Sequence, residues 1–198
     1  NIYKNYDLIL VDDLSEGLLN NLPKKLKKKL IKNKIQNIEK LNTKKLDGIF
    51  HFAAQSSVPL SLKDFYKSST NNLESSLKVF EFAKKFSAPV VYASSSAVYG
   101  NLPIGNDNEK KFSITSPYAR DKLTIEDYAK MFFEIFKTAS VGLRLFNVYG
   151  PGQRYNSPYS AVIPLFASRM LKKMPVIING GYQTRDFIYV DDVIQVMK

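Results

Sequence analysis

The chain has 198 residues, of which 44% are hydrophobic and 13% aromatic, so it is too apolar for a disordered segment and long enough for one hydrophobic core. It has no Cys and a single His, His51, which excludes a disulfide framework, a Cys-ligated metal site and a thiol nucleophile. No apolar run approaches the roughly 20 residues of a membrane span, and no signal-peptide pattern opens the chain. We therefore expect a cytoplasmic protein without a membrane partner.

The positive charge is concentrated in one segment. The formal net charge is +11, and the ten lysines between Lys24 and Lys45, with Glu39 as the only acid among them, supply +9 of it. Leu22, Leu26 and Leu30 recur there at helical spacing, which predicts a surface helix with one buried edge. The segment contains no Arg and no aromatic side chain on which a base could stack. We therefore expect a solvated face and no nucleic-acid partner, with salt-dependent nucleic-acid binding as the alternative.

Apolar runs and helical patterns alternate along the first 150 residues. The candidate buried strands are Leu8–Val11, Gly48–Ala54, Pro89–Ala93 and Val141–Phe146. The candidate helices are Asn72–Phe86 and Pro117–Phe136. Continuous apolar strands that alternate with helices favour an α/β fold with a doubly wound, Rossmann-like parallel sheet.

The texture of the sequence changes after Gly150. Several Pro and Gly residues mark irregular chain, followed by a short predicted helix and a predicted strand at Val176–Ile178. We therefore expect a Rossmann-like domain over residues 1–150 and the start of a smaller, substrate-binding subdomain over residues 151–198.

Small, polar or acidic residues follow each predicted strand. They are Asp12, then Ala53, Ala54 and Gln55, then Ser94, Ser95 and Ser96, and finally Asn147. Ligands of open parallel sheets bind beyond the carboxyl ends of the strands. The sequence therefore predicts a ligand site built from these four strand ends.

The sharpest local motif pairs Tyr118 with Lys122. Residues four apart in a helix share one face, so both side chains can point into one site. A free Tyr, with a pKa of about 10, is a poor base at neutral pH, but a nearby ammonium favours the phenolate and lowers that pKa. The pair is therefore a candidate for removing a proton from a hydroxyl group. The same spacing also occurs by chance on helix surfaces.

Six motifs in one order carry a resemblance. They are Asp12–Ser15, His51–Gln55, Ser94–Gly100, Ser116–Lys122, Leu145–Pro151 and Arg185–Asp192. Together they resemble the extended short-chain dehydrogenase/reductase family and its NAD-dependent epimerase/dehydratase members, most of all the UDP-glucose and UDP-N-acetylglucosamine 4-epimerases. The resemblance runs from about Leu8 to Lys198, and it includes the segment Asn156–Pro164, which is similar to the substrate lobe of those epimerases.

The resemblance implies a set of residues that bind NAD. Asp12 matches the acid that binds the adenosine ribose, which suits NAD better than NADP because a 2′-phosphate would be repelled. Ala53 and Ala54 match small residues beside the dinucleotide, and Asn72 matches an asparagine on its nicotinamide side. Asp13 and Gln55 are expected to line the same pocket, while Tyr118 and Lys122 reach the nicotinamide ribose.

The resemblance also implies catalytic and substrate-binding residues. Tyr118 matches the catalytic base and Lys122 its partner, and Ser95 matches the catalytic Ser or Thr, with Ser96 as an open alternative. Ser95 and Ser96 are expected at the substrate, and Asn147 and Arg185 match residues that hold its diphosphate. The implied reaction inverts C4 of a UDP-hexose through a 4-keto sugar, in an enzyme that is expected to form a homodimer.

Departures from the family pattern lead to further expectations. The sequence contains no G-x-x-G-x-x-G, so we expect the chain to be a fragment that lacks the first βα unit and the C-terminal end of the family fold. Ala97 stands where the 4,6-dehydratases and UDP-glucuronate decarboxylases keep an acid, which disfavours both of those reactions. The alternatives that remain are a UDP-glucuronate 4-epimerase and an inactive nucleotide-sugar-binding module.

The other titratable residues suggest structural roles. His51 lies within an apolar strand and is expected to be a hydrogen-bonded core residue. Asp191 and Asp192 are expected to cap a following helix rather than to bind a metal.

Overall fold

The computed structural model describes residues 6–109, 113–156, 160–178 and 180–198. The chain divides into two units, Asn1–Arg144 and Leu145–Lys198. The division falls a few residues before the expected boundary at Gly150. Part of the epimerase-like segment Asn156–Pro164, residues 157–159, lies outside the described residues.

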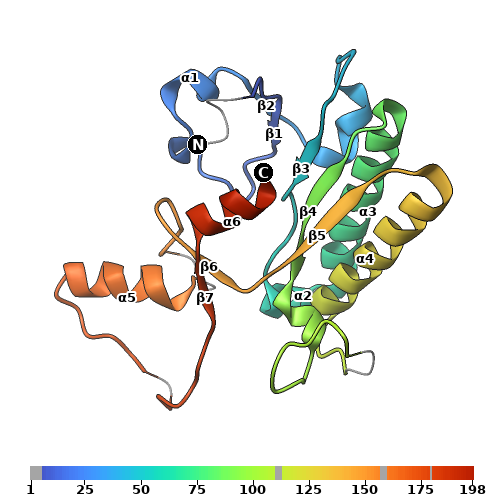
Figure 1. The fold of residues 1–198 in the computed structure, drawn as a ribbon. Coiled ribbons are helices and arrows are strands. Elements are labelled where there is room, and N and C mark those ends of the chain that lie inside the picture. Colours follow the sequence, from blue (N-terminus) through green and yellow to red (C-terminus); the bar gives the residue numbers. More distant parts are fainter. Residues whose placement is uncertain (1–5, 110–112, 157–159, 179) are drawn as a thin grey trace. The chain divides into compact units, whose positions relative to one another are not determined.

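The first unit contains parallel strands in two hydrogen-bonded groups (Figure 1). β1 (Leu10–Asp12) pairs in parallel with β2 (Leu30–Lys32). β3 (Ile49–His51) pairs in parallel with β4 (Val90–Ser95), which has β5 (Ser140–Leu145) on its other side. The expected α/β class with parallel, Rossmann-like strands is confirmed, and each of the four predicted strands has a counterpart in β1, β3, β4 or β5.

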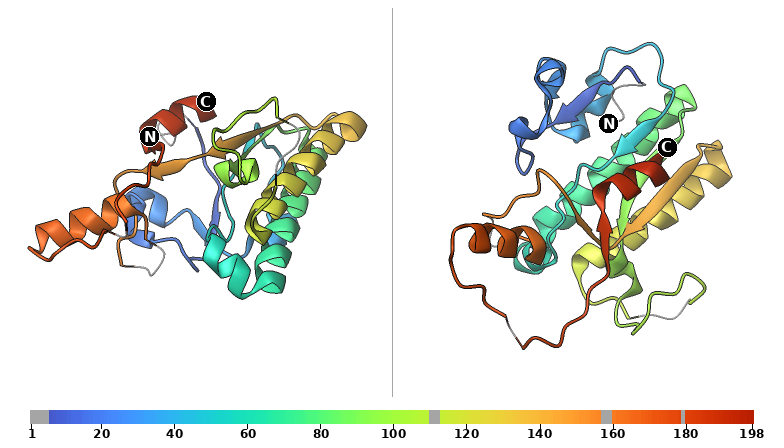
Figure 2. Two further views of the ribbon diagram at one scale, coloured as in Figure 1. Left: turned by 90° about the horizontal axis from the view of Figure 1, so that it is seen from below. Right: turned by 60° about the vertical axis from the view of Figure 1, so that its left-hand side comes forward.

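Two long helices pack beside each other against β3 and β4, as both Figure 1 and Figure 2 show. α3 covers Phe65–Phe86, and its N-cap Asp64 accepts a hydrogen bond from the Lys67 amide. α4 covers Pro117–Phe136, where Ser116 caps the first turn and Lys137 ends the helix in a left-handed conformation. α2 (Val58–Lys63) precedes α3 and contacts both long helices.

The core of this unit lies between the two helices and the sheet. Phe80 of α3 is 1% exposed and packs edge-on against Tyr92 of β4, with ring centroids 5.6 Å apart. Its ring also lies 5.5 Å from the ring of Phe132 on α4. These aromatic contacts hold α3, α4 and β4 together, and so fix the elements that carry Ser95, Tyr118 and Lys122.

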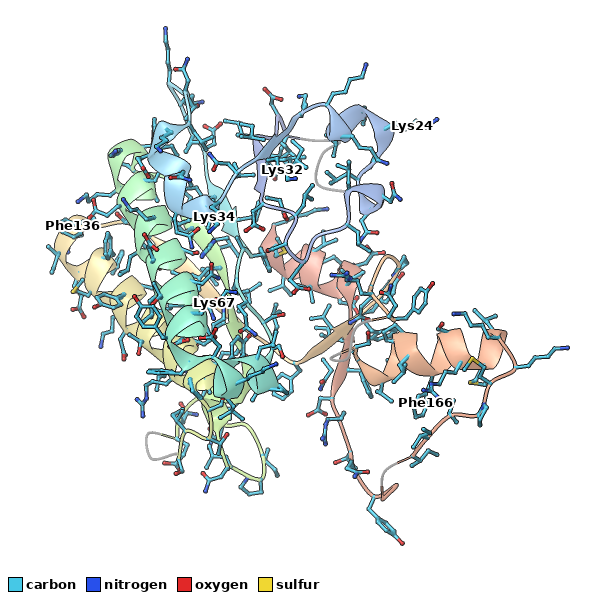
Figure 3. The ribbon with its side chains drawn as sticks, turned by 180° about the vertical axis from the view of Figure 1, so that it is seen from behind. Lys24, Lys32, Lys34, Lys67, Phe136 and Phe166 are labelled. Carbon is cyan, nitrogen blue, oxygen red and sulfur yellow. The ribbon has the colours of Figure 1, made fainter. Side chains whose placement is uncertain are left out.

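The lysine-rich segment does not form the expected amphipathic helix. α1 covers only Lys24–Lys27, where Leu26 is buried, and the chain then enters β2 and the 3-10 turns of η3 (Ile35–Lys40). Leu30 belongs to β2, where it pairs with Leu10. Nine of the ten lysines are exposed, so the expected solvated face is confirmed although its secondary structure was wrong (Figure 3).

The second unit is small. β6 (Asn147–Tyr149) pairs in parallel with β7 (Phe187–Tyr189), and α5 (Val162–Leu171) lies between them in sequence. α6 (Val190–Met197) follows β7 and has Tyr189 as its N-cap. Asp191 and Asp192 lie in its first turn instead, so the expectation that they cap the helix was wrong. The predicted strand at Val176–Ile178 was wrong, because these residues belong to no strand of the described sheets. The remaining short 3-10 helices are η2 (Leu19–Asn21) and η4 (Ser96–Tyr99).

Candidate functional site

Ser95 and Tyr118 lie close together in the first unit. Ser95 is the last residue of β4, and its Oγ accepts a hydrogen bond from the Ala97 amide at 3.1 Å. Tyr118 lies in the first turn of α4 and is 8% exposed, and Ser95 lies close enough to its phenol to lower the pKa of that phenol. Ser96 is the first residue of η4 instead. Of the two serines left open by the sequence, the structure therefore brings Ser95 to the tyrosine.

Lys122 completes this group from the next turn of α4. Its side chain is buried, and Nζ donates a hydrogen bond to the carbonyl oxygen of Ala93 at 2.7 Å. Nζ also lies 5.8 Å from the centre of the Tyr118 ring. A helix turn and a strand end thus place a hydroxyl, a phenol and an amine in one site, an arrangement that general acid–base chemistry on an alcohol can use.

Burial sets the proton affinities of this group. It lowers the pKa of Lys122 from 10.5 to about 8, against the opposing charge of Asp121. It also raises the pKa of Tyr118, while the nearby Ser95 hydroxyl lowers it by less. The sequence predicted a lowered Tyr118 pKa, and this was wrong: desolvation of the phenolate dominates, and the Lys122 ammonium is turned toward Ala93.

Two further buried titratable groups lie around Lys122. His51 Nε2 is 3.1 Å from Ser76 Oγ, and burial together with the Lys122 charge lowers the pKa of His51 to about 4. Asp121 accepts a hydrogen bond from Ser69 Oγ at 3.0 Å, and burial raises the pKa of its carboxyl. His51 is thus the hydrogen-bonded core residue that the sequence predicted, and it stays neutral at physiological pH.

The loop after β3 is held by its own polar side chains. Asn72, which is 1% exposed, accepts from the Gln55 amide at 2.8 Å and donates to the Gln55 carbonyl at 3.0 Å. The Gln55 side chain donates to the Ser57 carbonyl and accepts from Ser68 Oγ. Asn72 and Gln55 therefore shape the loop that carries Ala53 and Ala54, both of which are half-buried.

Ser61 is a contact that the sequence analysis missed. This residue of α2 is fully buried, donates to the Val58 carbonyl at 2.7 Å and accepts from the Tyr118 amide at 3.2 Å. It therefore helps to fix the turn of α4 that carries the tyrosine. Ser61 and Tyr118 are 57 residues apart in sequence, so no local pattern indicates this contact.

Asp12 and Asp13 follow one another at the end of β1. Asp12 is exposed, and one of its carboxylate oxygens accepts from the Leu14 amide at 2.7 Å. Asp13 accepts from both the amide and the hydroxyl of Ser15, and these hydrogen bonds lower its pKa. Asp12 thus offers free acceptor positions to a ligand, whereas Asp13 is engaged in its own turn.

Asn147 and Arg185 lie together in the second unit. Asn147 begins β6, and its side chain donates to the Asp186 carbonyl at 2.9 Å. Arg185 is exposed next to Asp186 and donates to the Thr184 carbonyl. The start of the β6–β7 ladder therefore carries one amide and one guanidinium, both suited to phosphate oxygens.

The described residues contain no group of three or more His, Cys, Asp or Glu arranged to hold a metal ion. Within the same residues, no helix is both long and apolar enough to cross a membrane.

Known proteins share this arrangement of strands and helices. A match to the NAD dependent epimerase/dehydratase family spans residues 2–198. This chain therefore belongs to that family, and its fold is the Rossmann-like fold of the family's epimerases. The family is NAD-dependent, which confirms the expected cofactor class.

Two solved structures and one curated protein illustrate the range of relatives. A UDP-N-acetylglucosamine 4-epimerase from Methanobrevibacter ruminantium M1, in complex with UDP-N-acetylmuramic acid, is 40% identical over 93% of this chain and 62% of its own, with a TM-score of 0.84. A UDP-glucose 4-epimerase from Thermotoga maritima, with UDP-glucose, is 29% identical over 98% of this chain and 65% of its own, with a TM-score of 0.87. The dTDP-D-glucose 4,6-dehydratase of Homo sapiens is 32% identical over 98% of this chain and 57% of its own. The chain thus spans less than two thirds of each of these relatives.

The end of β1 fits the adenosine end of NAD. The Asp12 carboxylate lies against Gly17, where an added Cβ would come within 3.0 Å of both carboxylate oxygens. Because Gly17 has no side chain, the Asp12 carboxylate has room to lie beside it. The exposed carboxylate can accept hydrogen bonds from ribose hydroxyls. The acid would repel the 2′-phosphate of NADP, so the residues present fit NAD.

Proposed function

We propose that this chain carries the catalytic centre of a nucleotide-sugar 4-epimerase that inverts C4 of a UDP-hexose, either UDP-glucose or UDP-N-acetylglucosamine. The observation that supports this proposal most strongly is the group formed by Ser95, Tyr118 and Lys122 at the end of β4 and the start of α4. NAD, when bound, supplies the hydride acceptor and donor of this chemistry.

In this proposal, the chain's own residues handle the proton and the sugar. The Tyr118 phenolate takes the proton from the C4 hydroxyl, and Ser95 donates a hydrogen bond to the same oxygen. The Lys122 charge favours the phenolate and so works against burial, which raises the pKa of Tyr118. The 4-keto sugar rotates in the site, so that the hydride returns to the opposite face of C4. Tyr118 returns the proton to the C4 oxygen, and the opposite C4 configuration results.

Residue 97 favours epimerisation over dehydration. A 4,6-dehydratase must also move protons at C5 and C6, and this needs a further acid or base near the catalytic hydroxyl. Here Ala97 follows the serines, and its backbone amide donates a hydrogen bond to Ser95 Oγ. Its side chain has no titratable group, so we propose that the chemistry stops at the 4-keto sugar and its reduction.

The other candidate residues divide between the two units. We propose that Asp12, Asp13, Ala53, Ala54, Gln55 and Asn72 form the cofactor side of the site. Asn147 and Arg185 would hold the diphosphate of the sugar nucleotide, because a guanidinium satisfies two phosphate oxygens at once. We further propose that the working protein is a homodimer.

A substrate panel tests this function on the complete polypeptide that carries this chain. UDP-N-acetylglucosamine, UDP-glucose, UDP-glucuronate and dTDP-glucose are incubated with the protein and NAD, and the products are identified by NMR. We expect C4 epimers from one or both of the first two. A 4-keto-6-deoxy product from dTDP-glucose, or epimerisation of UDP-glucuronate alone, would contradict the proposal.

A further inference from the structure

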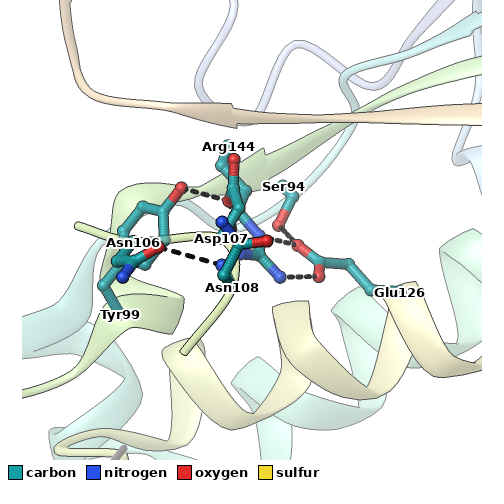
Figure 4. A network of polar contacts seen from close by, with 7 residues as sticks. All are labelled: Ser94, Tyr99, Asn106, Asp107, Asn108, Glu126 and Arg144. Carbon is teal, nitrogen blue, oxygen red and sulfur yellow. Dashed lines mark hydrogen bonds and ion pairs between the residues drawn. The ribbon is translucent and has the colours of Figure 1, made fainter. Parts of the chain in front are cut away.

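A second polar cluster joins β5, α4 and the loop that follows η4 (Figure 4). Arg144 of β5 donates from Nε and Nη2 to the two carboxylate oxygens of Glu126 on α4, at 3.0 and 2.7 Å. Its third nitrogen, Nη1, donates to Asp107 at 2.8 Å. Arg144 thus binds one carboxylate with a two-point fork and a second carboxylate with its remaining nitrogen.

This cluster is more than a surface ion pair. The Arg144 side chain is 24% exposed and that of Glu126 is 18% exposed, whereas the Lys130–Glu134 pair on the same helix is 77% and 60% exposed and 3.9 Å apart. The Arg144 guanidinium also lies 5.1 Å from the centre of the Tyr99 ring. Partial burial, bidentate geometry and ring stacking are the features that distinguish strong ion pairs from weak ones.

The cluster also holds the loop that leaves the catalytic strand. Tyr99, at the end of η4, donates its hydroxyl hydrogen bond to Asp107 at 2.7 Å. Gly105 packs against the Tyr99 ring, because a Cβ added to this glycine would lie 3.1 Å from the ring. The stretch from Tyr99 to Asp107 is therefore folded onto Arg144.

One contact connects the cluster to the catalytic group. Ser94 donates a hydrogen bond to Glu126, the same carboxylate that Arg144 holds. Ser94 directly precedes Ser95 on β4, and Glu126 lies one helix turn beyond Lys122 on α4. The Arg144–Glu126 pair therefore joins the strand end that carries the catalytic hydroxyl to the helix that carries the tyrosine and the lysine.

We propose that Arg144 and Glu126 are positioning residues, which hold the end of β4 against α4 and thereby keep Ser95 beside Tyr118. The inference rests on the proposed function for its catalytic consequence. The physical coupling of strand, loop and helix is independent of which sugar is turned over.

Hydrogen exchange of the complete protein tests the coupling without any substrate. Arg144→Met and Glu126→Gln are compared with Glu134→Gln, which removes a charge from the exposed pair on the same helix. We expect faster amide exchange over residues 92–109 in the first two variants and wild-type exchange in Glu134→Gln. Unchanged exchange in folded Arg144→Met and Glu126→Gln would overturn the coupling.

Kinetics of the same variants test the catalytic role. We expect kcat for C4 inversion to fall by ~10-fold to ~100-fold with KM nearly unchanged, because small displacements of reacting groups cost rate rather than binding. The acidic limb of the pH profile of kcat should move to higher pH, since a displaced Ser95 lowers the pKa of Tyr118 by less. Glu134→Gln should match the wild type in both respects.

Two milder variants cover the case in which a charge removal prevents folding. Ser94→Ala deletes only the contact between β4 and Glu126, and Arg144→Lys keeps the charge without the two-point fork. Both should shift the pH profile in the same direction and by less than Arg144→Met. A wild-type kcat and pH profile in these folded variants would overturn the positioning role. A complete protein that converts no nucleotide sugar would overturn the proposed function instead. In that case the hydrogen-exchange result decides whether the coupling exists.

Discussion

Tyr118→Phe is expected to lower kcat for C4 inversion about a thousandfold, a loss within the range of a general acid–base group. The ring is buried and packed, so Phe keeps the shape of the site and removes only the hydroxyl whose pKa Ser95 lowers. KM for the nucleotide sugar should change by less than about threefold, since the lost contact acts mainly in the transition state. Steady-state kinetics of the complete protein measure both constants.

Tyr128→Phe provides the matched control. Tyr128 lies on the same helix, α4, is half-buried, and is outside the Ser95 group. The same chemical change should leave its kcat within about twofold of the wild type. Retention of more than a tenth of the wild-type kcat by Tyr118→Phe would show that another group takes the proton.

Lys122→Met is expected to lower kcat by about a hundredfold while leaving the fold intact. The charge that favours the Tyr118 phenolate disappears, so the base loses its counterion. The free energy of unfolding at pH 7 should fall by no more than about 1 kcal/mol. The shift of the Lys122 pKa from 10.5 to about 8 means that burying the ammonium costs ~3 kcal/mol in the wild type. Met removes this cost, which offsets the ~2 kcal/mol lost with the hydrogen bond to Ala93.

The same pKa shift predicts how the stability difference between Lys122→Met and the wild type changes with pH. Because the folded-state pKa is depressed, the unfolded chain binds this proton more strongly between pH 8 and 10.5, so wild-type stability gains from this group as pH rises across that range. The cost of the buried charge is present in full below pH 8. The unfolding free energy of Lys122→Met minus that of the wild type should therefore be higher at pH 7 than at pH 10.

Urea unfolding at the two pH values measures this difference. Lys130→Met, which removes an exposed lysine from the same helix, should show the same difference from the wild type at both pH values. An unfolding free energy several kcal/mol below the wild type at pH 7 would contradict the account, because it would make Lys122 a structural residue first.

Local signals predicted the elements that carry the site. Ser116 and Pro117 mark the start of α4, and the structure begins the helix at Pro117, as the Ser cap and the Pro at the first turn indicate. The apolar run at Pro89–Ala93 likewise became β4 (Val90–Ser95), and its polar end is the place where parallel sheets bind ligands. These predictions depended only on neighbouring residues.

The contacts that hold the site could not be read in the same way. Glu126 and Arg144 are 18 residues apart, and they belong to a helix and a strand whose facing side chains are set by tertiary packing. The lowered pKa expected for Tyr118 failed for the same reason, because burial depends on how α4 packs and not on the spacing to Lys122. In the lysine-rich segment, Leu26 was correctly placed as a buried residue, but the strand pairing of Leu30 with Leu10 overrode the helical period.

The fate of a deuterium at C4 tests the central claim most directly. The complete protein is incubated with NAD and UDP-N-acetylglucosamine or UDP-glucose that carries deuterium at C4, and the product is analysed by NMR and mass spectrometry. The account predicts that the C4 epimer retains the deuterium at C4, because the same hydrogen is removed and returned within one site. Deuterium at C6 of a 4-keto-6-deoxy sugar, or an epimer whose C4 deuterium has exchanged with water, would contradict it.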